Sequence, residues 1–287
     1  MKLRILPVLL ISAVFSTLMV FGQSDEDNPI MPVYEEVPIY IGPVFGYNRS
    51  IHSVDLASFD EAICPRFQDG NDNGFYVGFS FEHHLGKDAT LSTSSFIFRV
   101  LYSTMPAFME TSEAPIPSLI TIVDGNGDPI GEDIINSSTR HTQQVDYSVV
   151  SAEVCYKINP IPGMGLGFTI GPTFDFALTK TQDQRYELLT PLEAQFRRNQ
   201  DAIDQLGYKY VDNDQVIIIK EGDIPNSNAF RLGIKAGVQY EILFGTLVIV
   251  PAMYYNYGVT NLSSQESWRV NALQVGVDLR WAVKLGL

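Results

Sequence analysis

The chain of 287 residues has no long apolar run after its first 22 residues. A helix that crosses a bilayer needs about 20 consecutive apolar residues, so the sequence excludes a helical membrane protein. Basic residues are also scarce, with 19 Lys and Arg against 33 Asp and Glu and a formal net charge of −14. Nucleic-acid-binding domains present a basic face, and we therefore expect no nucleic-acid partner.

Cysteine is nearly absent, with only Cys64 and Cys155 in the whole chain. Export would permit a disulfide. However, the strand assignment given below places Cys64 in an outer loop and Cys155 near the opposite end of a strand. A disulfide needs Cα atoms within about 7 Å, so we expect two free cysteines. Two isolated cysteines do not form a metal site, and the sequence indicates no cofactor.

The first 22 residues have the features of a secretory signal peptide. Lys2 and Arg4 precede an apolar run over residues 5–21, and the small residue Gly22 precedes a polar stretch. This order of basic, apolar and small residues is typical of a cleaved signal. A permanent anchor is the alternative, but the run is short for one and Pro7 interrupts it. We therefore predict a signal peptide over 1–22, a periplasmic segment over 23–36 and one domain over 37–287.

Within that domain, eight stretches alternate apolar and polar side chains. Each has roughly ten or more residues, enough for a tilted strand to cross the hydrocarbon core, whereas strands of soluble sandwiches have about five or six. The alternation slips near Val149, which predicts a β-bulge. The pattern predicts an all-β fold, an eight-stranded antiparallel up-and-down transmembrane β-barrel. The predicted strands are 37–47, 74–85, 90–102, 141–158, 165–179, 229–242, 246–258 and 268–283.

The connections between these stretches alternate in length. Segments 86–89, 159–164 and 243–245 are short, 48–73, 103–140 and 180–228 are long, and 259–267 is intermediate. Bacterial outer-membrane barrels have short periplasmic turns and longer extracellular loops, so we expect both termini in the periplasm and the long loops outside. Aromatic residues crowd the strand ends as in interfacial girdles. They include Tyr254, Tyr255, Tyr257, Trp268 and Trp281.

Charged residues occupy the inward parity of the predicted strands. Because buried charges must be paired, opposed charges among glycines predict a network of ion pairs that fills a narrow lumen. The alternative is a gated path for ions or small solutes. The residues of this predicted network are Glu82, Arg99, Glu153, Lys157, Asp175, Arg231, Lys235, Glu241, Asp278 and Arg280.

The long loops contain local structure signals. Residues 123–128 are typical of the tip of a hairpin, 190–206 of a short helix, and 216–220 of a further strand. Two acidic runs, Asp69-Asn71-Asp72 and Asp124-Asn126-Asp128, suggest calcium ligands. The second departs from the EF-hand pattern, with Pro129 where glycine belongs and Ile135 where glutamate belongs. Ordinary turn chemistry explains both runs better.

The sequence shows no recognisable set of catalytic residues. The four histidines are His52, His83, His84 and His141, and His83 and His84 fall beside a predicted periplasmic turn rather than the outer rim. A hydrolase would need a histidine paired with serine or an acid. We therefore expect a protein that is not an enzyme, with an enzyme sited at the outer rim as the weaker alternative.

The mature chain resembles the PorT-like and OmpA-like families of outer-membrane β-barrels. The resemblance is carried by Cys64-Pro65-Arg66-Phe67, residues 74–81, Gly171-Pro172 and residues 267–271. It implies a barrel with a role on the cell surface, in the envelope or as an accessory to secretion, and it transfers no catalytic residue. An OmpA-type peptidoglycan-binding domain is absent from the sequence, and the final residue is Leu287 rather than an aromatic.

Together these features predict a monomer embedded in the outer membrane. Its expected contacts are the lipid bilayer and a surface or envelope protein. The acidic long segments 103–140 and 180–228 favour a cationic partner or bound divalent ions, and they should stand together on the outer side. Connections this long are usually functional or disordered, so we expect recognition to reside there.

Overall fold

The computed structural model describes residues 39–57, 66–85, 93–112, 115–124, 126, 128–161 and 163–283. The predicted signal peptide, the segment 23–36, Cys64 and the turn at 86–89 lie outside these ranges. Among the described residues, no helix has both the length and the apolar character needed to cross a bilayer.

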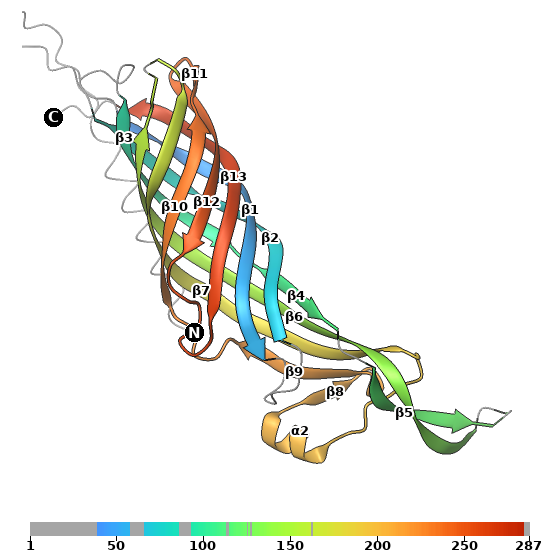
Figure 1. Ribbon diagram of the computed structural model, residues 1–287. Helices are drawn as coiled ribbons and strands as arrows, with labels where there is room; N and C mark the ends of the chain where they lie inside the picture. Colours follow the sequence, from blue (N-terminus) through green and yellow to red (C-terminus); the bar gives the residue numbers. More distant parts are fainter. Residues whose placement is uncertain are drawn as a thin grey trace, which may run out of the picture.

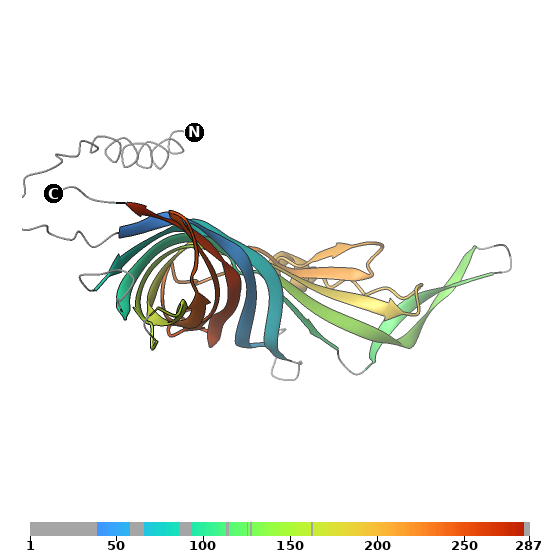
Figure 2. The ribbon, with the colours of Figure 1, turned by 90° about the horizontal axis from the view of Figure 1, so that it is seen from above.

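Eight long strands close an antiparallel barrel, as the sequence predicts (Figures 1 and 2). Each pairs with the next along the chain, and the last strand pairs with the first over the register Ile39↔Val283 to Val54↔Trp268. The strands are β1 (Ile39–Ala57), β2 (Arg66–His84), β3 (Ser94–Thr104), β6 (Pro129–Ile158), β7 (Leu166–Thr190), β10 (Phe230–Tyr240), β12 (Leu247–Gly258) and β13 (Trp268–Val283). Because the ring closes, no sheet edge remains in its wall.

Short connections lie at one end of the barrel, here called the turn end, and long ones at the other, the loop end (Figure 1). At the turn end, β11 (Ile242–Phe244) forms a tight hairpin with β12. The loop end carries β4 (Ala107–Thr111), β5 (Ile116–Val123), α2 (Gln200–Leu206), β8 (Lys209–Val211) and β9 (Val216–Asp223). The predicted hairpin tip lies between β5 and β6, and the strand predicted over 216–220 is β9.

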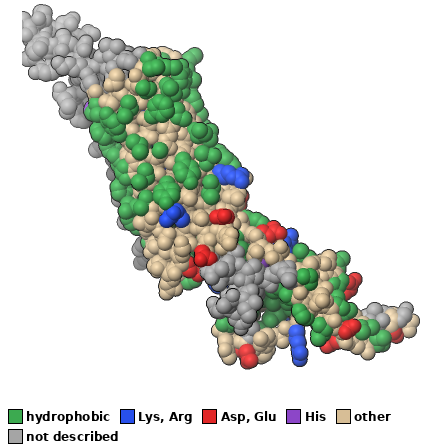
Figure 3. All heavy atoms as spheres, in the orientation of Figure 1, with side chains coloured by type: hydrophobic (Ala, Val, Ile, Leu, Met, Phe, Trp, Pro, Cys, Tyr) green, Lys and Arg blue, Asp and Glu red, His purple; other side chains and the backbone are tan. Residues whose placement is uncertain are grey.

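The outer wall is apolar toward the turn end. Alternate residues of each strand point outward there, and Figure 3 shows hydrophobic side chains spread over this wall. Phe79, Val100, Phe168 and Ile234 are exposed examples, as the alternation predicts. The band ends where outward positions become polar, at Arg49 in β1 and Asn73 in β2. Its height of about nine residues per strand matches the apolar belt of a membrane barrel.

Several strands continue far beyond this band, which corrects the predicted loops. Segment 48–73 is largely strand, because β1 runs to Ala57 and β2 starts at Arg66. Likewise β6 begins at Pro129 and β7 ends at Thr190. Between the band and the loop end, the inward residues are apolar or uncharged polar side chains, whereas most outward ones are polar. This reversal ends the apolar-out alternation, so sequence reasoning interpreted strand as loop.

The parity slip predicted at Val149 has a different origin. Val149 is buried inside the barrel on the same parity as Ser151 and Glu153, so β6 itself does not slip. The register does shift between Ser148 and Val149, and the extra residue lies in the partner strand β7, at Leu178. The slip in the sequence pattern of β6 is a change of hydrophobic face, and the bulge itself belongs to β7.

The long segments fold together at the loop end, as predicted. Tyr186 of β7 packs with Ile217 and Ile219 of β9, and Ile116 and Phe196 pack against that cluster. Leu119 and Gln195 also form an isolated antiparallel bridge. The helix predicted over 190–206 is shorter than expected, and Leu192 lies outside it.

Two of the five expected girdle aromatics are placed differently. Tyr255, Tyr257 and Trp281 are exposed on the outer wall, whereas Tyr254 and Trp268 are buried inside the barrel. Both inward residues lie on the parity shared with charged or small side chains. Their position at strand ends suggested an interface, although their parity indicated the lumen.

Candidate functional site

The barrel interior toward the turn end is filled by charged side chains. They come from inward positions of β2, β3, β6, β10 and β13, which the closed register brings around one narrow space. Small inward residues make room for them and for tyrosine. At Gly276, a Cβ atom would stand 2.2 Å from the Tyr76 hydroxyl and 2.4 Å from the Phe45 carbonyl oxygen. Only glycine permits this close approach.

Arg99 occupies the centre of the charged network. Its guanidinium donates to Asp278 at 2.9 Å and lies 3.9 Å from a carboxylate oxygen of Glu153. Lys235 pairs with the same Glu153. Arg99 also donates to the Tyr254 hydroxyl and stacks over that ring, with 4.5 Å from its guanidinium carbon to the ring centroid. These contacts join five strands across the lumen, β3, β6, β10, β12 and β13.

The network continues toward the turn end through Arg280. Arg280 donates to Asp278 at 2.5 Å and pairs with Glu82. Lys157 bridges Glu82 and Glu241. Of these carboxylates, only Glu241 is measurably exposed, because it lies at the rim.

A second, smaller cluster lies toward the loop end. Arg231 donates to Asp175 at 2.7 Å and to the carbonyl oxygen of Val270 at 2.8 Å. Ser151 donates to the other oxygen of Asp175 at 2.7 Å. Five cations therefore face five anions in the lumen, and the set is formally neutral. The cations are Arg99, Lys157, Arg231, Lys235 and Arg280, and the anions are Glu82, Glu153, Asp175, Glu241 and Asp278.

Charge balance determines what the network can do. Removing ions from water is costly, and only close pairing with further hydrogen bonds offsets that cost. Here every cation has a carboxylate partner, and the carboxylates share cations. The arrangement holds the strands together in the turn-end half of the lumen. It offers no single-sign row of charges of the kind that lines an ion-selective pore.

The interior toward the loop end is apolar instead. Its largest member, Trp268, is fully buried and donates its indole N–H to Nδ1 of His52 at 3.0 Å. The other ring nitrogen of His52 donates to the carbonyl oxygen of Met105 at 3.0 Å. This links β13, β1 and the bend between β3 and β4 in one plug. The remaining members include Val54, Phe67, Ala107, Met109, Val145, Tyr147, Val149, Ile224, Leu262, Val270 and Ala272.

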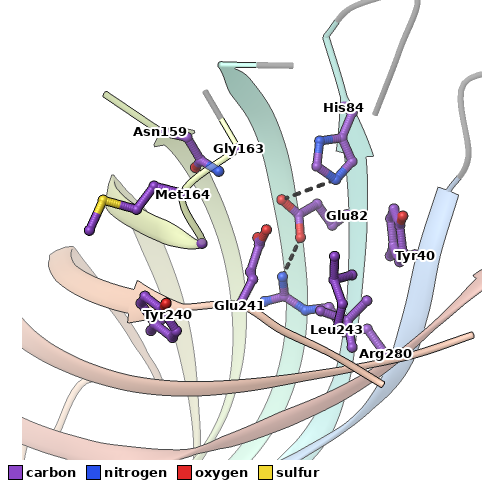
Figure 4. Close-up of a pocket in the computed structure, with 12 residues that line it drawn as sticks. Tyr40, Glu82, His84, Asn159, Gly163, Met164, Tyr240, Glu241, Leu243 and Arg280 are labelled. Atoms are coloured by element: carbon purple, nitrogen blue, oxygen red, sulfur yellow. Dashed lines mark hydrogen bonds and ion pairs between the residues drawn. The ribbon is translucent and has the colours of Figure 1, made fainter. Parts of the chain in front are cut away.

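A cavity of about 340 Å³ opens at the turn end of the lumen (Figure 4). Glu82 forms part of its lining, with His84 Nε2 3.8 Å from its carboxylate and Arg280 on its other oxygen. Tyr40 packs edge-on against His84, with ring centroids 5.3 Å apart. The cavity is therefore bounded on its inner side by the charged network.

The structure places all ten residues predicted for the lumen network in these two charged clusters. Sequence reasoning missed the apolar plug and the roles of His52, Met105, Tyr254 and Trp268. The available signal was the inward parity of Tyr254 and Trp268. The bend at Met105 gave none, because it depends on contacts between distant segments.

The histidines are dispersed. His52 belongs to the plug, His84 to the turn-end cavity, and His141 packs against Phe67 and Tyr186 at the loop end. No cluster of three or more His, Cys, Asp or Glu able to hold a metal occurs among the described residues. Cys155 is free and buried inside the barrel.

The acidic runs have defined geometry. One carboxylate oxygen of Asp124 accepts the backbone N–H groups of Asn126 and Asp128 at 2.8 and 2.9 Å. This is the turn chemistry favoured above. The other run was expected in a turn, but Asp69, Asn71 and Asp72 lie within strand β2, which corrects that expectation.

No protein-family model matches the sequence, and no curated protein matches it. Among solved structures, it is similar to Neisserial surface protein A, with 11% identity, a TM-score of 0.33 and coverage of 85% of this chain and 97% of the other. Ail, the attachment invasion locus protein of Yersinia pestis in complex with the heparin analogue sucrose octasulfate, shows 12% identity, a TM-score of 0.31 and coverage of 85% and 99%. The outer membrane protease OmpT of Escherichia coli shows 8% identity, a TM-score of 0.32 and coverage of 89% and 100%. The fold is accordingly assigned from the strand pairing of this chain.

Proposed function

We propose that this chain is an outer-membrane β-barrel with a closed lumen, and that its loop-end extension binds a partner at the cell surface. The observation that carries the proposal is the layered interior of the barrel. A neutral ion-pair network fills one half and an apolar plug the other, inside a wall with an apolar outer band.

The apolar band supports location in a membrane. Closed barrels satisfy every backbone polar group within lipid, and an outward band of this height suits a bilayer. The alternation of short and long connections supports placing the turn end in the periplasm and the loop end outside. Under this proposal the signal peptide directs export, and the protein is a monomer because its wall has no open edge.

The role is that of a binding or envelope protein rather than an enzyme. His52, His84 and His141 lie in three separate parts of the barrel. The PorT-like resemblance, with its implied secretion-accessory role, remains a prediction. An enzyme at the outer rim is the weaker alternative.

Planar-bilayer recording tests the closed lumen. The purified barrel should give no steady current, because both halves of the lumen are occupied. A narrow channel would instead conduct in the wild-type protein and lose its current in Arg231→Ala or Asp278→Ala. Steady wild-type currents would contradict the proposal.

Cysteine labelling tests the orientation. A background with both Cys64→Ser and Cys155→Ser that carries Leu192→Cys should react with a membrane-impermeant maleimide on intact cells. The same background carrying Ile161→Cys should react only after the envelope is opened. The reverse result would place the loop end in the periplasm.

A further inference from the structure

The most unusual part of the loop end is the two-stranded ribbon formed by β5 and residues Pro129–Ser137 of β6, here called the arm. Its register runs from Ile116↔Ser137 to Val123↔Pro129. Figures 1 and 2 show the arm extending away from the barrel. An isolated two-stranded ribbon is marginally stable in water, so the arm is an element with less support than the rest of the sheet.

One edge of the arm is open along β6. The pairing of β6 with β7 begins only at Ser138↔Thr190, and β7 ends there. Residues 129–137 of β6 therefore have β5 on one side, and no described strand pairs with their other side. The open edge continues the line that β7 would occupy if it were longer. Such an edge is a template for pairing with another extended chain.

The arm also exposes apolar side chains. Ile134 of β6 is 65% exposed on one face of the arm, and Ile130, the extra residue where the register shifts, is 67% exposed. Ile122 of β5 is exposed on the opposite face, because it is paired with Gly131. Apolar residues on both faces of a solvated ribbon indicate a surface that another molecule covers.

Charge indicates what that molecule is. From Pro115 to Thr139 the sequence contains four carboxylates, Asp124, Asp128, Glu132 and Asp133, and no Lys, Arg or His. The next cation along the chain, Arg140, is already held by Glu187 at 2.6 Å. Two copies of the arm would repel each other, so the acidic surface opposes self-pairing. A basic chain would be attracted to the same edge.

We propose that the arm binds an extended basic segment of another protein, which adds as a strand to the open edge of β6 at residues 129–137. Backbone hydrogen bonds along the edge supply part of the affinity, and pockets for alternate side chains supply selectivity. Ile130 and Ile134 contact apolar residues of the incoming strand. Glu132 and Asp133 select lysine or arginine beside them. This inference rests on the proposed surface-binding function.

The test uses the full chain in lipid nanodiscs and two ten-residue peptides. One alternates lysine with valine, and its counterpart alternates glutamate with valine. The lysine peptide should bind at least tenfold more tightly, and binding should weaken as salt increases. Amide hydrogen exchange within residues 129–137 should slow when it binds. Equal binding of both peptides, or protection confined to other strands, would overturn the proposal.

Matched variants locate the site. Ile130→Ser with Ile134→Ser should weaken lysine-peptide binding at least tenfold, as should Glu132→Lys with Asp133→Lys. The control is Leu192→Ser, since Leu192 is an isolated apolar residue that is 79% exposed at the loop end but outside the arm. It should bind like the wild type. Each variant should retain heat-modifiable migration, which reports a folded barrel.

Two further outcomes would overturn the inference. Binding that survives both arm variants would move the site elsewhere. A concentration-dependent dimer that the isoleucine variant abolishes would make the occupant a second copy of this chain. Neither outcome affects the closed-lumen proposal, which bilayer recording tests separately. Steady conductance would contradict that proposal while leaving the arm's peptide binding intact.

Discussion

The two halves of the barrel interior are built from the same strands and have opposite chemistry. Toward the turn end, where the outer wall is apolar, inward side chains are charged and paired. Toward the loop end, where the outer wall is polar, an apolar cluster that includes Trp268 fills the centre of the interior. Away from the register shifts in the β1–β2 pair and at Leu178 of β7, the strand parity is the same in both halves, and only the hydrophobic face changes. This is expected when a strand passes from lipid into water, because the apolar face always turns away from water.

Arg99→Ala is the strongest way to break this comparison. It removes the central cation of the turn-end network and leaves Asp278 and Glu153 with fewer partners. Breaking a buried ion pair costs about 3–5 kcal/mol. Urea unfolding from phospholipid vesicles should show a loss of this size. Asp183→Ala, which removes an exposed partner of Arg185, should change stability little. Equal losses in both variants would show that burial does not strengthen the network.

Arginine scanning along β6 sharpens the contrast between the outer surfaces. Val154 and Gln144 share the outward parity of one strand, but only Val154 lies within the apolar band. Val154→Arg should cost about 2–4 kcal/mol because it places a charge in hydrocarbon. Gln144→Arg should lie within about 0.5 kcal/mol of the wild type because its position is in water. The same unfolding assay measures both, and a similar cost at the two positions would place the band boundary elsewhere.

The same reversal explains how much the sequence could predict. The alternation of apolar and polar residues predicted eight strands and a closed barrel. In β2, for example, Phe79 has the outward parity and Glu82 the inward parity of one uninterrupted alternation. The same alternation placed the charged residues on the inward side of the strands and so predicted that they line the lumen. The loop-end half of the lumen could not be predicted in this way. There Val145 and Tyr147 point inward while Gln144 and Asp146 point outward, and this resembles a slipped register or a loop.

Contacts between distant segments account for the remaining gap. The pairing of Trp268 with His52 joins residues 216 positions apart, and no local pattern encodes it. The arm was predicted only as a hairpin tip near Asp124. Its open edge depends on where β7 ends relative to β6, which is a property of register rather than of composition.

The stability of the loop-end sheet should depend on pH in a way that the stability of the rest of the barrel does not. His141 lies at the loop end, outside the apolar band. Burial beside Phe67 and Tyr186 lowers its pKa from 6.5 to about 4. Below pH 6.5 the unfolded segment takes up a proton that the folded segment does not. The stability of this sheet should therefore fall by about 2–3 kcal/mol as pH decreases from about 6.5 to about 4.

Amide hydrogen exchange measures this local stability. Exchange in β9 and in residues 138–143 of β6 should accelerate as pH falls, after correction for the intrinsic rate. His141→Gln should flatten that dependence. A dependence that persists in His141→Gln would assign it to another group.

The smallest effect is expected at the tip of the arm, and it decides between a turn and a calcium loop. The Asp124 carboxylate accepts two backbone N–H groups across the tip, from Asn126 and Asp128. Asp124→Ala removes these bonds, each worth about 0.5–1.5 kcal/mol, so exchange of the Asn126 and Asp128 amides should speed up severalfold while the barrel is unaffected. Addition of millimolar calcium to the wild type should leave those rates unchanged, because the carboxylate oxygen is already used by the backbone. Calcium-dependent protection that disappears in Asp124→Ala would instead make the tip a cation site, and it would then shield part of the negative charge on which binding of a basic strand depends.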